Sequence, residues 1–544
     1  MLSKQDEQIP KYCLQSSCMF YILLYPAPKI TIMHIDKLVI SNRSVLLKKY
    51  GNSGLTKVQS AIKKMISNDK KRQVKTMFVF LDDSQHMKRV KGKQVTDSTD
   101  AEQNKNAIDS FARYYRPDYF LLLGAPDVIP HCKFKIAIPG DDDAFVPSDV
   151  PYACEAAFSR NAGDFIAPAR VLGRLPDLAG SNDVSSLLKL VDNAVKWKPL
   201  KATEYNNYFS LSVKWWEKST RLSLDNIFQD NSKLKMAPPS LKDYTKKELG
   251  ARMHFFNCHG GLRTPEFYGQ PNGSSSSYPV CYHTDMLKNS VSFGTVIAAE
   301  CCYGAHLYNA LRPTLIPQPI CNTYLLNGAL AFLGSTTAAY GPADSQGAAD
   351  YITQYFLIAI RKGASSGRAF LEAQQRFVEK GDVKMDPMDL KTIIQFILLG
   401  DPSLSPVEEP QKENSPKNPV SSIVNRSENE LRERKERREK MSQKAVFINA
   451  VSDTPVKIST TVRGTVKKEI DAVLKHHNFN NECTLSYGFK KRQAAQFKKA
   501  GAPSDYKYHL YSCLSAGPVV DTLRVLVIQE VDNKVLEVKE YVRR

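Results

Sequence analysis

The sequence predicts an α/β protein: a mostly parallel sheet with helices on both faces, built as two sheet subunits, followed by a small α+β domain. Three observations predict this architecture. Short apolar runs alternate along the chain with segments of helical periodicity. The runs are continuously apolar, which is typical of parallel strands that are covered on both sides. The chain has 544 residues, 42% of them hydrophobic, enough for several domain-sized units.

The first sheet subunit is predicted over residues 34–200, after an N-terminal extension of residues 1–33. Its apolar strands are His34–Ser41, Val74–Leu81 and Tyr119–Leu123. Apolar residues recur at helical spacing in Leu55–Ser67, Asn104–Tyr115 and Asp183–Trp197. Pro117 ends the second of these helices, because proline cannot continue a helix.

The second sheet subunit is predicted over residues 201–406. Its strands are Phe209–Val213, Met253–Phe256, Thr295–Ala299, Ala329–Leu333 and Phe396–Leu399. Its helices are Thr220–Phe228, Tyr351–Ile360 and Gly367–Phe377. Between them, Asp230–Gly250 is polar and rich in lysine, so we expect this stretch to be exposed.

A change in composition separates these subunits from the end of the chain. Residues 407–444 are rich in proline and charged residues, which is typical of a linker. Within it, Leu431–Lys440 indicates a solvated helix or a flexible tether. A separate α+β domain is predicted over residues 445–544, and it ends in a hairpin whose strands, Leu523–Ile528 and Val535–Val542, flank Asp532-Asn533.

Charge and cysteine content limit the classes of function. Lys and Arg number 75 against 56 Asp and Glu, a net charge of +19, but no stacking or recognition-helix motif accompanies it, so nucleic acid is not the expected partner. Eleven scattered cysteines without a Cys-x-x-Cys pair indicate reduced thiols and a cytoplasmic protein. Secretion is the alternative location. The apolar run Cys18–Ala27 is too short to span a membrane, and acidic residues precede it.

Two apolar strands of the second subunit end in reactive residues. Met253–Gly261 reads MHFFNCHGG and presents His259 beside a double glycine, whereas Thr295–Gly304 reads TVIAAECCYG and presents Cys301 and Cys302. The carboxyl ends of parallel strands share one edge of a sheet, so we expect His259 and a cysteine to meet there. An imidazole beside a thiol generates the thiolate that nucleophilic catalysis needs.

The spacing favours Cys302 over Cys301 as the nucleophile. His259 and Cys302 lie 43 residues apart, near the ~50 residues of caspases. Cys302-Tyr303-Gly304 also fits the Cys-x-Gly ending of the caspase signature. Two alternatives stay open. These cysteines and the histidine are core residues, or they belong to a zinc site formed by Cys258, His259, Cys281, His283 and His306, although these spacings match no metal motif.

The order of a strand ending in His-Gly and a strand ending in Cys-x-Gly resembles the caspase-fold cysteine peptidases. Within that clan the chain is most similar to the gingipain-like peptidases. The segments that carry this similarity are Tyr119–Pro130 (YFLLLGAPDVIP), Pro147–Ala153 (PSDVPYA), Val171–Pro176 (VLGRLP), Phe332–Thr336 (FLGST) and Leu399–Ser403 (LGDPS). The resemblance covers residues 34–405 and implies a caspase-like fold.

The resemblance implies a thiol protease, an endopeptidase that uses a His259–Cys302 dyad. It also implies that Asp149 faces the P1 side chain of the substrate, the residue before the cleaved bond, and so favours Arg or Lys. The alternative role for Asp149 is a turn or cap after Pro147. Gingipains orient the histidine with an acidic residue, for which Asp141–Asp143 lies in the corresponding region.

The residues themselves suggest the rest of the site. We expect the backbone N–H groups of Gly260 and Cys302 to form an oxyanion hole, and Ser335, Thr336 and Thr337 to line a substrate pocket. The chemistry requires no cofactor, and the resemblance admits calcium although no calcium-loop spacing occurs. The expected partners are a protein or peptide substrate and a regulatory partner at the C-terminal domain. The alternative function is a catalytically silent caspase-like scaffold that binds a protein or nucleic acid.

Overall fold

A computed structural model describes residues 34–310, 318–379, 385–408, 421–451, 454–458, 462–479, 484–492, 505–515 and 521–544. Residues His34–Arg544 form one compact unit. The predicted N-terminal extension and residues 409–420 of the predicted linker lie outside the described residues.

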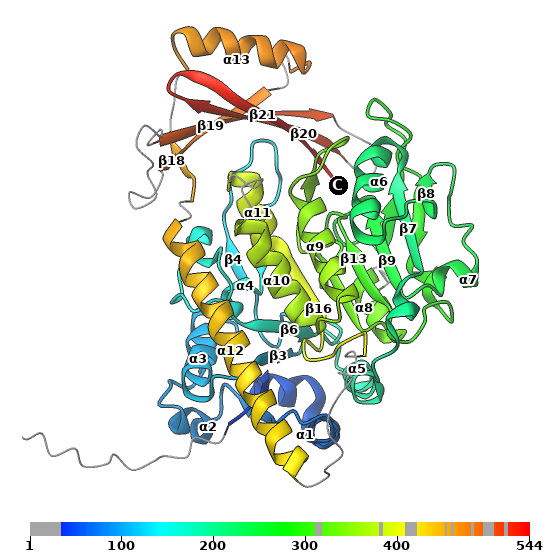
Figure 1. The fold of residues 1–544 in the computed structure, drawn as a ribbon, viewed down its shortest axis with the longest axis vertical. Coiled ribbons are helices and arrows are strands. Elements are labelled where there is room, and N and C mark those ends of the chain that lie inside the picture. Colours follow the sequence, from blue (N-terminus) through cyan, green and yellow to red (C-terminus); the bar gives the residue numbers. More distant parts are fainter. Residues whose placement is uncertain are drawn as a thin grey trace, which may run out of the picture. The chain divides into compact units, whose positions relative to one another are not determined.

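A ten-stranded sheet runs through this unit in the order β2-β1-β3-β6-β16-β14-β13-β9-β7-β8 (Figure 1). Its first half contains β1 (Lys37–Ser41), β2 (Thr76–Phe80), β3 (Tyr119–Leu123), β6 (Val171–Leu175) and β16 (Phe396–Gly400). Its second half contains β7 (Tyr208–Val213), β8 (Leu234–Ala237), β9 (Met253–Asn257), β13 (Val296–Ala299) and β14 (Ala331–Ser335). All neighbouring strands are parallel except β14 and β16.

The two halves therefore join edge to edge and run in opposite directions. This architecture confirms the predicted fold class. Most strands are buried along their whole length, as continuously apolar sequences require when helices cover both faces. One difference is β8, which lies in the lysine-rich stretch that we expected to be only exposed.

Helices form at the predicted segments: α1 (Arg43–Lys71), α3 (Ala101–Tyr115), α5 (Ser185–Lys196), α6 (Glu217–Phe228), α9 (Ala349–Arg361) and α10 (Ser366–Glu379). The structure adds shorter helices that were not predicted: α2 (Ser84–Arg89), α4 (Val150–Ala153), α7 (Lys246–Leu249), α8 (Ile320–Leu326) and α11 (Pro387–Gln395). Local chemistry sets their ends: Asp100 caps α3 by accepting from the N–H groups of Glu102 and Gln103. None of the described helices is both long and apolar enough to cross a membrane.

Two small sheets lie beside the large one. The strands β10 (His259–Gly260), β11 (Glu266–Tyr268) and β12 (Val280–His283) form an antiparallel sheet directly after β9. The strands β4 (Cys132–Phe134) and β5 (Val146–Ser148) form a hairpin in the chain segment between β3 and β6.

The C-terminal part is a six-stranded sheet in the order β15-β21-β20-β19-β18-β17. Its strands are β15 (Tyr340–Gly341), β17 (Val456–Ile458), β18 (Thr484–Arg492), β19 (Asp505–Ser515), β20 (Thr522–Val531) and β21 (Lys534–Arg543), and α13 (Thr465–His476) lies between β17 and β18 in the chain. The predicted hairpin is β20 and β21, with positive φ at Asp532 and Asn533 as a tight turn requires.

The C-terminal sheet is not separate from the rest. Strand β15 follows β14 in the second half of the large sheet, yet it pairs with β21. The long helix α12 (Ser421–Val451) covers part of the predicted linker and the start of the predicted domain. The boundary expected at residue 445 therefore falls inside a helix.

Candidate active site

The structure brings His259 and Cys302 to one edge of the sheet. Strands β9 and β13 are parallel neighbours in which Phe256 lies opposite Ala299. His259 follows the end of β9 and Cys302 follows the end of β13. The two segments touch, because a Cβ atom on Gly260 would lie 1.8 Å from the Cys302 carbonyl oxygen. Only glycine permits this approach.

His259 is fully buried and held in one orientation. Its Nε2 lies 2.8 Å from Gln270 Oε1, so Nε2 carries the proton and donates. The rings of Trp216 and Tyr278 pack against the imidazole, at centroid distances of 4.5 Å and 5.1 Å. Burial lowers the pKa of His259 to about 4. The imidazole is therefore neutral at pH 7, and its Nδ1 is a buried acceptor without a partner among the described residues.

Cys302 is also buried. Its sulfur accepts a hydrogen bond from the Ala339 N–H at 3.2 Å. Burial raises the pKa of the thiol to about 11, and the nearby Arg543 guanidinium opposes this rise. The resting pair is therefore a neutral thiol and a neutral imidazole with a free nitrogen. In general, an imidazole beside a thiol is able to take the thiol proton and so generate a thiolate.

The two adjacent cysteines lie in different apolar clusters. Cys301 belongs to the main core, with Cys258 and Cys281. Burial and hydrogen bonds of the Cys258 thiol with Cys281 and Cys301 raise the pKa of Cys258 well above its usual range, so these three thiols lie together. Cys302 belongs to a second cluster that includes residues of the C-terminal sheet. Cys302 therefore faces the C-terminal sheet, whereas Cys301 faces the main core.

The carboxylate of Asp149 is paired with other side chains of the protein and is not free to meet a substrate side chain. Arg174 donates to both of its oxygens, from Nε at 2.7 Å and from Nη2 at 2.5 Å. His131 Nδ1 lies 2.8 Å from Oδ1. Although burial acts to raise it, these two neighbours hold the pKa of Asp149 well below its usual range. The charge is neutralised inside the protein, and the expected P1 role is corrected for that reason.

The other predicted acidic residues pair with a lysine. Asp141 and Asp143 both contact the ammonium group of Lys391, and Asp143 also accepts from the Ala338 N–H at 2.9 Å. The resemblance implied an acidic residue that orients the histidine. The side chain that bonds to His259 is the neutral amide of Gln270. Sequence analysis gave no signal for this glutamine.

The predicted pocket residues after β14 use their side chains internally. The Ser335 hydroxyl donates to the carbonyl oxygens of Cys301 and Thr337, at 3.2 Å and 2.7 Å. The Thr336 hydroxyl donates to Pro147 O, and the Thr337 hydroxyl donates to Gln395 Oε1. The three hydroxyl groups are therefore engaged by other residues of the protein, and only that of Ser335 contacts the cysteine segment.

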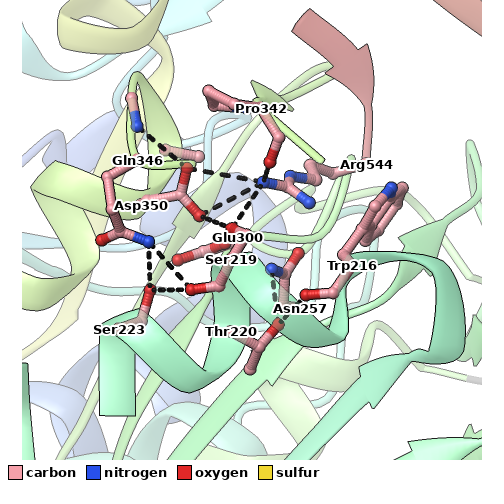
Figure 2. Close-up of polar contacts among 12 residues, drawn as sticks. Trp216, Ser219, Thr220, Ser223, Asn257, Glu300, Pro342, Gln346, Asp350 and Arg544 are labelled. Carbon is pink, nitrogen blue, oxygen red and sulfur yellow. Dashed lines mark hydrogen bonds and ion pairs between the residues drawn. The ribbon is translucent and has the colours of Figure 1, made fainter. Parts of the chain in front are cut away.

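A pocket that sequence analysis missed holds the side chain of Arg544 (Figure 2). The guanidinium Nη2 lies 2.8 Å from Pro342 O, 3.2 Å from Asp350 Oδ1 and 3.4 Å from Ser219 Oγ. Its carbon lies 4.4 Å from the centre of the Trp216 ring, a cation–π contact. The Arg544 side chain is fully buried, and its Nε and Nη1 have no protein partner in the described part of the chain.

Two carboxyl groups lie at this pocket, on segments far apart in the sequence. Glu300 follows β13, and Asp350 is in the first turn of α9. Burial and repulsion from Asp350 raise the pKa of Glu300 well above its usual range. This rise favours the protonated, neutral form of Glu300.

The pocket adjoins the dyad. Trp216 contacts both the His259 ring and the Arg544 guanidinium. The Cys302 N–H donates to the Arg544 carbonyl oxygen at 3.3 Å. A second, open pocket of about 430 Å³ adjoins Gly260 and Tyr303 and is flanked by Asp142 and Arg543.

Across the described ranges, no group of three or more His, Cys, Asp or Glu side chains is arranged to hold a metal ion. The zinc alternative therefore has no cluster among these residues.

The comparison with known families agrees with this geometry. The model of peptidase family C25 matches residues 38–407, more than half of the chain, a range that includes His259 and Cys302. The chain belongs to peptidase family C25. Members of this family, the gingipain family, are cysteine peptidases, so the chain is a hydrolase that acts on proteins or peptides. No curated protein matches the chain.

Proposed function

We propose that this C25 peptidase is an endopeptidase that uses His259 and Cys302 to cleave after arginine, and more slowly after lysine. The observation that carries the specificity is the pocket of Trp216, Glu300 and Asp350, which holds a buried arginine beside the proposed nucleophile. A buried carboxylate favours a cationic side chain, because an unpaired charge inside a protein is costly. A planar guanidinium also stacks on an indole better than an ammonium does.

The proposed reaction is acyl transfer. A substrate takes the position of Arg544, and His259 Nδ1 accepts the thiol proton as Cys302 Sγ attacks the carbonyl carbon. The N–H groups of Cys302 and Gly260 stabilise the oxyanion. The protonated imidazole then gives its proton to the leaving amine, the C–N bond breaks, and water hydrolyses the thioester.

The low pKa of His259 suits this cycle. An imidazolium in this buried site is a strong acid, so it transfers its proton readily to the leaving amine. Gln270 keeps the Nε2 proton in place and so fixes Nδ1 as the basic atom. The other neighbours of the ring, Trp216 and Tyr278, carry no formal charge.

The test is hydrolysis of fluorogenic peptides that differ only at P1, with Arg, Lys, Asp, Asn or Leu. Wild type is compared with Cys302→Ala, Cys301→Ala and Asp350→Asn, with and without calcium. Because Arg544 occupies the pocket, the series is repeated with Arg544→Ala. A slow rate of hydrolysis is sufficient for this test, because rates are compared between peptides and between variants.

We expect arginyl peptides to be cleaved fastest, with complete loss in Cys302→Ala and retention in Cys301→Ala. Asp350→Asn removes the charge that faces P1, so kcat/KM for arginyl peptides should fall at least tenfold, about 1.4 kcal/mol or more. Cleavage after an uncharged residue would leave the dyad and overturn the specificity. If neither the wild type nor Arg544→Ala shows cleavage that depends on Cys302, the proposal is wrong.

A further inference from the structure

The end of strand β21 lies where a peptide substrate of this enzyme would bind. It pairs antiparallel with β15, so that Arg543 lies opposite Tyr340 and Val542 opposite Gly341. One residue further, the Arg544 N–H donates to the Ala339 carbonyl oxygen at 2.9 Å. Addition of an extended segment to an exposed strand is a common mode of peptide recognition. In Figure 1 the end of the chain, marked C, lies near α6 and α9 of the large-sheet unit.

The backbone of Arg544 also binds the N–H group that we propose for a substrate carbonyl. Its carbonyl oxygen accepts from the Cys302 N–H at 3.3 Å. This is the N–H that we assign to the oxyanion hole. Backbone and side chain of Arg544 thus make, in one residue, the contacts expected of a P1 arginine.

The fit between Arg544 and the strand opposite it is close. A Cβ atom on Gly341 would lie 2.3 Å from the Arg544 guanidinium, so the absence of a side chain there gives the arginine its path into the pocket. Figure 2 shows the side chain directed at Asp350 and the Pro342 carbonyl group. The pocket has a complete occupant from its own chain.

We infer that residues 542–544 inhibit the peptidase in cis: they fill the substrate strand position and the arginine pocket, and the enzyme acts only when they leave. The inference rests on the proposed function, because it takes the occupied site to be the substrate site. It also gives the C-terminal sheet a role, which is to hold this inhibitory segment in place.

The contacts around the segment explain why it stays. Tyr541, just before it, belongs to the same apolar cluster as Cys302 and Tyr340, together with Leu523 of β20. Arg543 donates to the Tyr303 hydroxyl at 3.3 Å and faces Asp142. Since β21 is also paired along its length with β20, the inhibitory residues remain near the site at a high effective concentration.

Competition in cis has a defined kinetic signature. A substrate binds only the fraction of molecules whose pocket is open, so the apparent KM rises by the reciprocal of that fraction. The value of kcat is unaffected, because the chemistry begins only after the segment has left. Loss of the Arg544 side chain should therefore lower KM and leave kcat as it was.

The first measurement separates binding from catalysis. In the Cys302→Ala full chain, the affinity for a labelled acetyl-peptidyl-arginine amide is measured by fluorescence anisotropy, with and without Arg544→Ala. We expect the added substitution to strengthen binding by about tenfold or more. Arg544→Lys keeps a cation in the pocket and should give an intermediate affinity. An unchanged affinity in Arg544→Ala overturns the inference.

The matched control is Arg524→Ala. Arg524 is in the same C-terminal sheet, but it donates to Glu540 and to the His477 carbonyl group and does not enter the pocket. This variant should bind the peptide as weakly as the parent. If it gains as much affinity as Arg544→Ala, the effect is loosening of the sheet in general, and the inference fails.

The second measurement is hydrolysis of the same peptide with Cys302 present. Arg544→Ala should lower KM about tenfold or more at unchanged kcat. If binding improves in the first measurement and no variant hydrolyses the peptide, then the proposed function is wrong and the pocket is still closed by its own chain. If hydrolysis is Cys302-dependent and equal in wild type and Arg544→Ala, then the function stands and the inhibition is wrong.

Discussion

At the scale of single residues, two aspartates show how placement decides a role. Asp149 and Asp350 are both buried and both face a guanidinium. The partner of Asp149 is Arg174, whose other nitrogen donates to the carbonyl oxygens of Gly124 and Ile129, inside the first half of the sheet. The partner of Asp350 is Arg544, near Cys302. The first pair lies within the fold, and the second lies in the pocket that we propose for a P1 arginine.

This difference gives a prediction for Asp149→Asn. The substitution leaves the Arg174 charge buried without its counter-ion, which costs about 3 kcal/mol or more. We expect a clearly lower Tm in thermal unfolding and no change in the order of preferred P1 residues.

The control for this prediction is Asp142→Asn. The Asp142 side chain is 64% exposed, so its loss should leave Tm nearly unchanged. If Asp149→Asn keeps its Tm but loses its preference for arginine, then Asp149 binds the P1 side chain and this prediction is wrong.

The sequence predicts a dyad of His259 and Cys302 and gives no signal for the Arg544 pocket, for a physical reason. His259 and Cys302 each lie within three residues of the end of an apolar strand and within two residues of a following glycine, and that local pattern can be read in one segment. The pocket combines Trp216, Glu300 and Asp350 from three distant segments, and none of these residues lies in a recognisable motif. Only the folded sheet brings them together. Asp149 was chosen instead because its local sequence resembles a family segment.

At the scale of elements, strands were easier to predict where their apolar run is unbroken, and the central strand β6 was missed because Gly173 and Arg174 interrupt its run. The apolar runs that became β3, β9 and β13 stand out because both faces of these strands are buried. Strand β8 was missed because it is at the edge of the sheet and carries Lys235, whose ammonium group lies 2.6 Å from Glu248. Lysines on an edge strand oppose pairing with other chains, and they also hide the strand from sequence patterns.

The contact between the two catalytic segments predicts the effect of Gly260→Ala. A Cβ atom there would lie 1.8 Å from Cys302 O, a backbone atom that cannot turn aside. The segments must separate, and His259 moves away from the thiol. We expect Cys302-dependent hydrolysis of arginyl peptides to fall about a hundredfold or more, because loss of dyad geometry removes base catalysis.

The neighbouring glycine is the control. At Gly261 the nearest atom to an added Cβ is the Thr264 hydroxyl oxygen, at 2.9 Å, and that side chain is able to rotate. Gly261→Ala should therefore retain most of the activity. Near-normal activity in Gly260→Ala would show that the two segments do not need to touch during catalysis.

At the scale of the whole molecule, the C-terminal sheet and the peptidase form one unit. The sequence suggested an independent domain, because the composition changes after residue 407. The pairing of β15 with β21 could not be predicted, since it joins Gly341 to Val542 with no shared motif. A two-residue strand such as β15 carries no periodicity that sequence analysis can detect.

This unity has a thermodynamic consequence. If β21 and substrate compete for one site, each must weaken the other by the same factor. A peptide that fills the pocket should therefore loosen the end of β21. We expect saturating acetyl-peptidyl-arginine amide to speed amide hydrogen exchange in the last residues of β21 in the Cys302→Ala full chain, measured by mass spectrometry. Exchange in α3, which lies in the first half of the molecule, should not change. Slower exchange in β21 would mean that peptide and strand bind together, and the pocket would then have to be assigned to a ligand other than substrate.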